Sequence, residues 1–328
     1  FVLAKLAALF PHAAGPAYFV EKAFGATLGK SIGFIFLLII PLGVPAAILM
    51  TTSFIDAIFD LNRFQLLIAA FSIVALLYIL NVRGIQISAR IQFAITLSIL
   101  AIVFLLLVLS GATENKTNLA LPIQHNSVSP ILIAAGIAFW SFLGVEAMTH
   151  LSTEFENPKK DMLPAMLIGT AVVGLVYLIC TYLIVILPNN AGIAMVPIFD
   201  QLVGGYGSYI IGGLGIAGGI STTNVYTASA TRLMASFAES RVLPSVLAKT
   251  NQHNVPINAL VLTLTLMSCT LTASYLLDQE LEDLISWVNG VFVIIYSASM
   301  FAAFKLLSNK HFISIALSLV FCLMLGIG

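Results

Sequence analysis

A carboxylate lies inside one of the most apolar stretches of the chain. Residues 138–148 read AFWSFLGVEAM, so Glu146 follows a run of aromatic and small residues. An ionised carboxylate in hydrocarbon costs several kcal/mol, so Glu146 should face the interior of a helix bundle or a water-filled cavity. There it could exchange a proton or act at a gate, or it could hydrogen-bond a neighbouring helix. The sequence leaves both interpretations open.

Gly136 and Gly144 weaken the same predicted helix, since each glycine costs about 1 kcal/mol relative to alanine. A helix that breaks at membrane depth must direct its freed N–H and C=O groups at a cavity or a ligand, because lipid cannot bond them. Two half-helix ends can hold the carboxylate and the ammonium of a zwitterion. We therefore predict a break within residues 139–146 that binds an amino acid. Close helix packing through glycine is the alternative.

The elements that must position this stretch are membrane-spanning helices. Of the 328 residues, 60% are hydrophobic and 9% are charged, against roughly 25% charged in soluble domains. Apolar runs of the length that crosses a bilayer recur along the whole chain. The sequence thus predicts an all-α, polytopic helical membrane protein with a single transmembrane domain over residues 1–328. No basic patch lies outside short loops, which excludes nucleic acid as a partner.

The spans are predicted from apolar runs between charged, proline, glycine and asparagine positions. A helix remnant covers residues 1–10, and about nine spans follow, at 30–56, 64–81, 91–110, 130–151, 164–187, 207–236, 257–277, 284–305 and 312–328.

Basic residues gather in alternate connections between these spans. On one side of the membrane, the connections contain only two basic residues, Arg63 and Lys116, together with the acidic segment 278–283. The other side is therefore expected to be cytoplasmic, since positive charge is retained there. It contains Lys22, Lys30, Arg83, Arg90, Lys159, Lys160, Arg232, Arg241, Lys249, Lys305 and Lys310.

The sequence lacks the residues that two other functional classes, a membrane enzyme and a channel, would require. A membrane enzyme would need a nucleophile with a base or a metal cluster, but the five histidines are scattered and no HExxH or GxSxG pattern occurs. The three cysteines lie singly in apolar runs, so no metal site and no cofactor are expected. A channel would need a filter-like carbonyl loop or a ring of charges, and neither is visible.

Several stretches resemble one known family. FWSFLGVEA and EFENPKKDMLPAM resemble the sixth-helix signature of the amino acid–polyamine–organocation (APC) superfamily of transporters. FPHAAGPAYFVEKAFG, NVRGIQISARIQ and ATRLMASFAESRVLPSVLAK are similar to its first cytoplasmic loop, its entry into the fifth helix and the end of its eighth helix. IIPLGVPAA and WVNGVFVIIY look most similar to its bacterial L-methionine/branched-chain amino acid exporter branch. Together these stretches cover nearly the whole chain.

The resemblance implies a LeuT-like fold of two inverted five-helix repeats in a multi-pass protein of the bacterial inner membrane. Since the chain starts and stops inside apolar runs, we expect a fragment without the first helix and most of the second. The side of the broken helix that would face the first helix should then show an open groove.

The implied function is secondary active transport of neutral amino acids, namely methionine, leucine, isoleucine and valine, by export or exchange through alternating access. An amino acid/proton symporter of different specificity is the alternative, ahead of a membrane enzyme or a channel. The implied partners are the amino acid, a proton or sodium ion, and the lipid bilayer.

Site residues follow from the same resemblance. It implies that Trp140 stacks on the substrate, that Tyr226 faces the cavity and that Glu146 lies near a gate or couples protons. Ser221, Thr222 and Thr223 form a candidate ion site, although hydroxyls that tie helices together are the favoured interpretation. The expected substrate-binding residues are Phe139, Trp140, Ser141, Phe142, Gly144 and Tyr226.

Overall fold

The computed structural model describes residues 1–111, 128–279 and 281–325. These ranges are helical, with no strand and one isolated bridge between Thr250 and Pro256. The predicted all-α class is therefore confirmed. Within the described ranges, each predicted span corresponds to one or two helices, and residues 326–328 of the last span lie outside these ranges.

The helices are α1 (Val2–Leu9), α2 (Pro16–Phe24), α3 (Ala26–Leu37), α4 (Ile39–Phe59), α5 (Arg63–Val82), α6 (Ile85–Ser110), α7 (Val128–Phe142), α8 (Val145–His150), α9 (Pro158–Ile186), α10 (Met195–Leu202), α11 (Gly207–Glu239), α12 (Ile257–Leu277), α13 (Leu281–Leu306) and α14 (Phe312–Leu325). Three short 3₁₀ segments lie between them: η1 (Ser152–Glu154), η2 (Ser245–Ala248) and η3 (Asn309–His311).

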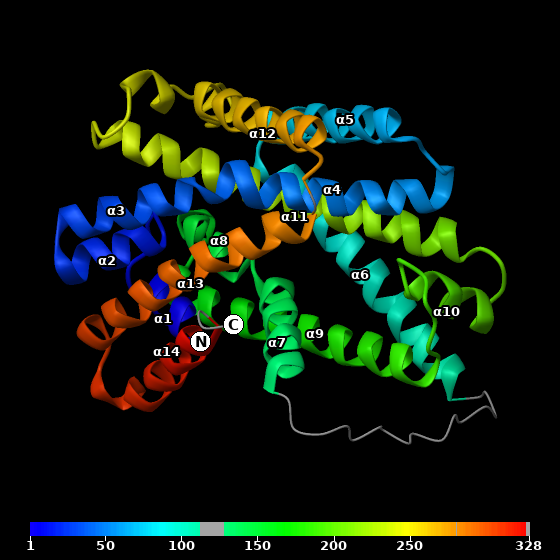
Figure 1. The fold of residues 1–328 in the computed structure, drawn as a ribbon. Helices are drawn as coiled ribbons and strands as arrows, with labels where there is room; N and C mark the ends of the chain where they lie inside the picture. The colour runs from blue at the N-terminus through cyan, green and yellow to red at the C-terminus, as the bar shows by residue number, and fades with distance from the viewer. Residues whose placement is uncertain (112–127, 280, 326–328) are drawn as a thin grey trace.

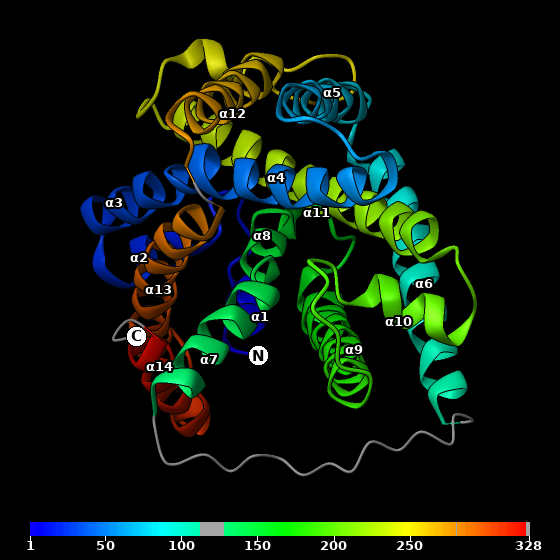
Figure 2. The same cartoon turned by 45° about the vertical axis from the view of Figure 1, so that its right-hand side comes forward.

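The centre of the bundle is formed by α4 and α11, which run side by side in both views (Figures 1 and 2). Helices α5 and α12 lie on one side of this pair, and α7, α9, α13 and α14 lie on the other (Figure 1). Glycines of α11 allow the close approach, since a Cβ at Gly215 or Gly219 would meet Phe54 or Thr51 of α4. The close packing fixes the two helices that carry most of the site.

Six helical segments in the described ranges are long and apolar enough to cross a membrane. Helix α11, with 33 residues, is about 50 Å long, which also exceeds the roughly 30 Å of a hydrocarbon core. The chain is thus a multi-pass membrane protein. The six segments are Ala26–Phe59, Arg63–Val82, Arg90–Ser110, Pro158–Ile186, Ile257–Leu277 and Leu284–Leu306.

Helices α2 and α10 were not among the predicted elements. Both are short and amphipathic, and each buries aromatic and aliphatic residues such as Phe19 of α2 and Phe199 of α10. The span predicted at 30–56 is divided into α3 and α4 by an interruption at Leu38, whose backbone stays in the right-handed helical region, and the two helices together form the segment Ala26–Phe59. Pro41 and Pro45 follow this interruption and lack the N–H groups that would continue the helical hydrogen bonds.

Contacts between connections support the predicted alternation of the two ends. Arg63, at the start of α5, forms an ion pair with Asp278, with 2.8 Å between Nη2 and Oδ1, so the α4–α5 and α12–α13 connections share one end. At the opposite end Asn251 Nδ2 donates to the carbonyl oxygen of Val82 at 3.0 Å. The connections that contain Arg83 and Lys249 therefore lie together, as the charge pattern predicts.

Candidate functional site

The helix that carries the carboxylate is broken. Helix α7 ends at Phe142 and α8 begins at Val145, with Leu143 and Gly144 in a turn between them. Gly144 has a φ of +123°, a conformation that residues with a Cβ rarely adopt. The break predicted within residues 139–146 is confirmed.

Glu146 is fully buried one residue into α8 and accepts hydrogen bonds from three sides. The N–H of Gly144 lies 3.2 Å from Oε1 and 3.1 Å from Oε2, so the carboxylate itself bonds a backbone group that the break frees. Tyr226 of α11 donates its hydroxyl to Oε1 at 2.7 Å, and Tyr296 of α13 donates to Oε2. Glu146 thus faces the bundle interior, as predicted, and ties α8 to two other helices.

The far end of α8 is held by the connection between α1 and α2. The backbone N–H of His12 donates to Ser152 Oγ at 3.1 Å, and His150 Nδ1 lies 2.9 Å from the carbonyl oxygen of Ala13. Gly15 has a φ of +49° and lies so close to Thr149 and His150 that a Cβ would clash with both. Helix α8 is therefore fixed at both of its ends.

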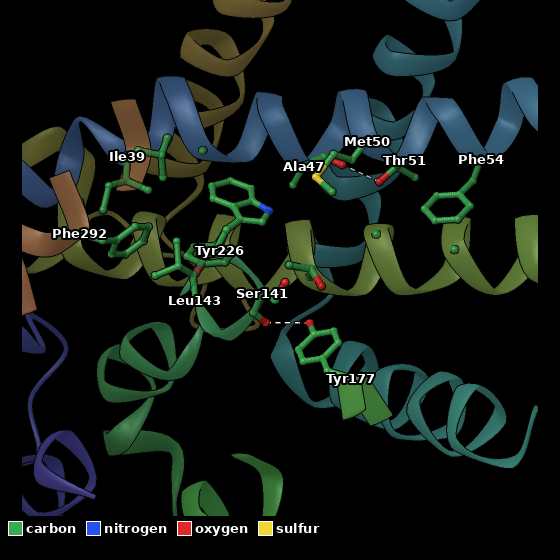
Figure 3. Close-up of a pocket in the computed structure, with 16 residues that line it drawn as sticks. Ile39, Ala47, Met50, Thr51, Phe54, Ser141, Leu143, Tyr177, Tyr226 and Phe292 are labelled. Carbon is green, nitrogen blue, oxygen red and sulfur yellow. Dashed lines mark hydrogen bonds between the residues drawn. The ribbon is translucent and has the colours of Figure 1, made fainter. Parts of the chain in front are cut away.

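A cavity of about 340 Å³ lies beside the break, between α4, α7, α9, α11 and α13 (Figure 3). None of its lining residues is charged. Tyr177 of α9 closes one side by donating its hydroxyl to the carbonyl oxygen of Ser141 at 2.7 Å, as the dashed line in Figure 3 marks. The lining residues are Ile39, Gly43, Ala47, Met50, Thr51, Phe54, Trp140, Ser141, Leu143, Tyr177, Gly215, Gly219, Thr222, Tyr226, Val288 and Phe292.

Three of the six predicted substrate-binding residues, Trp140, Ser141 and Tyr226, line this cavity. The other three do not. Phe139 is buried against Tyr296, with ring centroids 5.7 Å apart, in the core around α1 and α13.

Phe142 packs against Tyr177, with ring centroids 5.4 Å apart, and is not among the residues that line the cavity. Gly144 borders a separate cavity of about 310 Å³ between α7, α8 and α9. Successive residues of α7 point in different directions, so the four consecutive residues 139–142 cannot all face one cavity.

The cavity residues from α4 and α13, among them Met50, Thr51, Phe54 and Phe292, were not predicted. Met50, Thr51 and Phe54 lie in ordinary apolar or helix-forming sequence with no local motif, whereas Phe292 lies in the WVNGVFVIIY stretch, which was interpreted only for its family resemblance. Pairing of α4 with α11 brings the α4 residues to the site, and that pairing is visible only in the folded molecule. The glycines of α11 were the one signal that pointed to it.

The three candidate ion-site residues have different surroundings. Thr222 lines the cavity, whereas the Thr223 hydroxyl is buried and donates to carbonyl oxygens of its own helix, at Gly219 (2.9 Å) and Ile220 (3.0 Å). The carbonyl oxygen of Ser221 accepts from Gln92 Nε2 of α6 at 3.4 Å. The Thr223 hydroxyl is thus bonded within α11, and only the Ser221 carbonyl joins two helices.

Apolar grooves flank the broken helix on its other sides. One is the 310 Å³ cavity beside Gly144, lined also by Met148 and Thr170. The other, of about 320 Å³, is lined by Phe139, Phe142 and Tyr296 among others. The expectation that the side facing the first helix of the fold is an open groove stays a prediction.

Membrane-spanning helices packed around a cavity at a broken helix define a membrane transport protein. The chain belongs to the amino acid permease family, whose sequence profile matches residues 1–327. This result confirms the family expected from the sequence motifs.

Individual relatives agree with this assignment. The chain is 32% identical to the L-methionine/branched-chain amino acid exporter YjeH of Escherichia coli, over 99% of this chain and 78% of the relative. It is 28% identical to the uncharacterized amino acid permease YecA of Bacillus subtilis, over 94% of this chain and 74% of the relative. It is 27% identical to an arginine/ornithine antiporter of Latilactobacillus sakei, over 77% of this chain and 57% of the relative. All three are named as transport proteins and none as an enzyme.

Proposed function

We propose that this protein exports or exchanges neutral amino acids, with methionine, leucine, isoleucine and valine preferred, by alternating access across the bacterial inner membrane. The observation that carries the proposal is the 340 Å³ cavity at the helix break, whose lining has no charged side chain. A basic or acidic substrate side chain would lose its hydration there without gaining a counter-charge. An apolar side chain has no such cost.

The walls of the cavity support the same substrate class. Trp140, Tyr226 and Phe292 offer large apolar ring surfaces. The volume lies at the lower end of the range of about 300–1,000 Å³ that is common for small-molecule sites. These features fit a compact apolar amino acid.

Similarity to the Escherichia coli exporter supports the outward direction and the substrate set, since that relative aligns with 99% of the chain. The proposal also includes one transmembrane domain over residues 1–328, organised as two inverted repeats. Alternating access would move the helices of one repeat against the other around the cavity.

We assign proton coupling or gating to Glu146 through Tyr226. Tyr226 lines the cavity and also donates to Glu146, so its hydroxyl connects the substrate space to the buried carboxylate. An ionised carboxylate only accepts hydrogen bonds, whereas a protonated one also donates, so protonation would reverse the hydrogen bond to one tyrosine and remove the strengthening that the negative charge gives to both. That change would loosen α8 from α11 or α13. The proposal takes a proton as the coupling ion because Glu146 is a titratable group connected to the cavity by Tyr226.

Competition for transport tests this function. Inverted membrane vesicles with the full-length protein should accumulate radiolabelled methionine, and unlabelled leucine, isoleucine and valine should compete for it. Lysine, arginine and glutamate should compete weakly. Stronger competition by arginine than by unlabelled methionine would refute the neutral substrate class.

A further inference from the structure

A second cavity lies at the end of the bundle where most basic residues gather. It encloses about 260 Å³ between α1, α9 and the connection from α13 to α14. Lys5, Lys159 and His311 line it together with Ser308. No aspartate or glutamate is among its lining residues. It is separate from the cavity at the helix break and shares no residue with it.

The three basic side chains come from different parts of the chain. Lys5 belongs to α1, Lys159 to the first turn of α9 and His311 to η3, and the packing of α1 on α9 and α14 brings them together. Lys5 and His311 are half-buried, and Lys159 is exposed. Within the ranges that the structure describes, neither lysine forms an ion pair with a carboxylate. Cations gathered without a counter-charge attract an anion.

The remaining lining residues are aliphatic, which restricts the kind of anion. They form the apolar part of the cavity lining, at a membrane end where Leu9 has 49% of its surface exposed. A free anion gains nothing from such a lining, whereas a lipid can place its acyl chains there. These residues are Ala8, Leu9, Leu163, Leu306 and Leu307.

We propose that this cavity binds the headgroup phosphate of an anionic phospholipid from the cytoplasmic leaflet. Lys5 and Lys159 contact the phosphate oxygens as point charges, and Ser308 and His311 supply further polar contacts. The acyl chains pass along Leu9 and Leu163. The site joins α1 to α9 and to the start of α14 without touching the substrate cavity, so the inference stands apart from the proposed function.

Native mass spectrometry of the full-length protein in detergent, titrated with dioleoyl phosphatidylglycerol or dioleoyl phosphatidylcholine, tests this site. Phosphatidylglycerol should bind more tightly than phosphatidylcholine. Lys159→Gln should weaken phosphatidylglycerol binding about five-fold, and Lys5→Gln with Lys159→Gln about 25-fold, since each basic residue near the surface contributes about 1 kcal/mol. Lys5→Arg with Lys159→Arg should retain binding.

Lys249→Gln is the matched control, because Lys249 is an exposed lysine of the same membrane end and does not line the cavity. It should leave lipid binding unchanged. Equal affinity for the two lipids, or unchanged phosphatidylglycerol binding in the Lys159→Gln variant, would overturn the proposal. Displacement of the lipid by millimolar inorganic phosphate would also overturn it, since the site would then belong to a free anion.

Discussion

Glu146 is the residue whose surroundings define the site at the smallest scale. Its two oxygens accept from Gly144, Tyr226 and Tyr296 while the side chain is fully buried. The sequence predicted the burial, because a carboxylate in an apolar span must face inward. The tyrosine partners could not be predicted, since they lie 80 and 150 residues further along the chain.

Tyr296→Phe should destabilise the protein, because it removes one donor to a buried carboxylate. Losing a hydrogen bond to a charged group costs about 1.5–3 kcal/mol, so the thermal unfolding temperature should fall measurably in a fluorescence-based assay. Tyr182→Phe serves as the control, because Tyr182 is 50% exposed on α9. An equal, small effect of both changes would show that the Tyr296 hydrogen bond contributes nothing.

Glu146→Gln distinguishes a role of Glu146 in proton coupling from a role only in hydrogen bonding between helices. Glutamine has nearly the same shape but does not titrate, so substrate binding should stay close to normal while transport loses its pH dependence. Methionine flux measured between pH 5 and 8, for the variant and the unchanged protein, checks this outcome. The same pH profile in both proteins would leave Glu146 with only a structural role.

At the scale of elements, the two half-helices α7 and α8 depend on the conformation of Gly144. Gly144→Ala should destabilise the protein by about 1–2 kcal/mol, because a φ of +123° strains any residue with a Cβ. The nearest atom to an added Cβ would be the Tyr226 hydroxyl at an ordinary 3.7 Å, so the cost is conformational rather than steric.

Gly136→Ala is the control within α7. Nothing lies within 4 Å of an added Cβ there, so alanine should be neutral or stabilise the helix. Chemical unfolding of both variants measures the difference. Equal stabilities would show that the break does not need glycine. The sequence predicted the place of the break from Gly136 and Gly144. It did not predict helices such as α2, because with 9 residues α2 is far shorter than the apolar runs from which the spans were predicted.

The connection between α1 and α2 should make stability depend on pH. Burial lowers the pKa of His12, and Glu21 and Glu239 offset only part of this effect. The unfolded chain therefore binds a proton more readily, so stability is full above about pH 6.5 and falls as the pH drops below that value. Protonation would also break the hydrogen bond in which His12 Nδ1 accepts from the N–H of Ala14 at 3.0 Å.

His12→Asn should reduce this loss, because asparagine can accept the same hydrogen bond without titrating. Unfolding temperatures at pH 5.5 and pH 7.5, compared between the variant and the unchanged protein, measure this loss of stability. The control is His253→Asn, in an exposed position of the loop before α12, which tests whether any replacement of a histidine gives the same result. If His12→Asn leaves the drop at low pH intact, His12 is not its source.

For the whole molecule, the end that carries the basic residues should face the cytoplasm. In intact cells, a membrane-impermeant maleimide should label cysteine introduced at Asp60 or Asp278 but not at Lys249, in a background where Cys180, Cys269 and Cys322 are alanine. The alternation of charge predicted which connections share an end, and the Arg63–Asp278 ion pair agrees. Labelling of the Lys249→Cys variant alone would show that the end with the basic residues faces away from the cytoplasm.

The cavity is the feature of the whole molecule that sequence could predict least. It combines residues of five helices, and only Trp140, Ser141 and Tyr226 among the predicted substrate-binding residues line it. Which helices pack together depends on contacts between distant segments, such as the glycines of α11 against α4, and local patterns do not determine these contacts.

The central claim is that the cavity beside the break binds the amino acid, and Trp140 tests it most directly. Equilibrium binding of radiolabelled methionine to full-length protein should weaken roughly ten-fold in Trp140→Ala, because the substrate loses an aromatic contact surface. Trp287→Ala removes the other tryptophan, which is 50% exposed on α13 and does not line the cavity, so binding should be unchanged. Equal affinity of the Trp140→Ala protein and the unchanged protein would contradict the account.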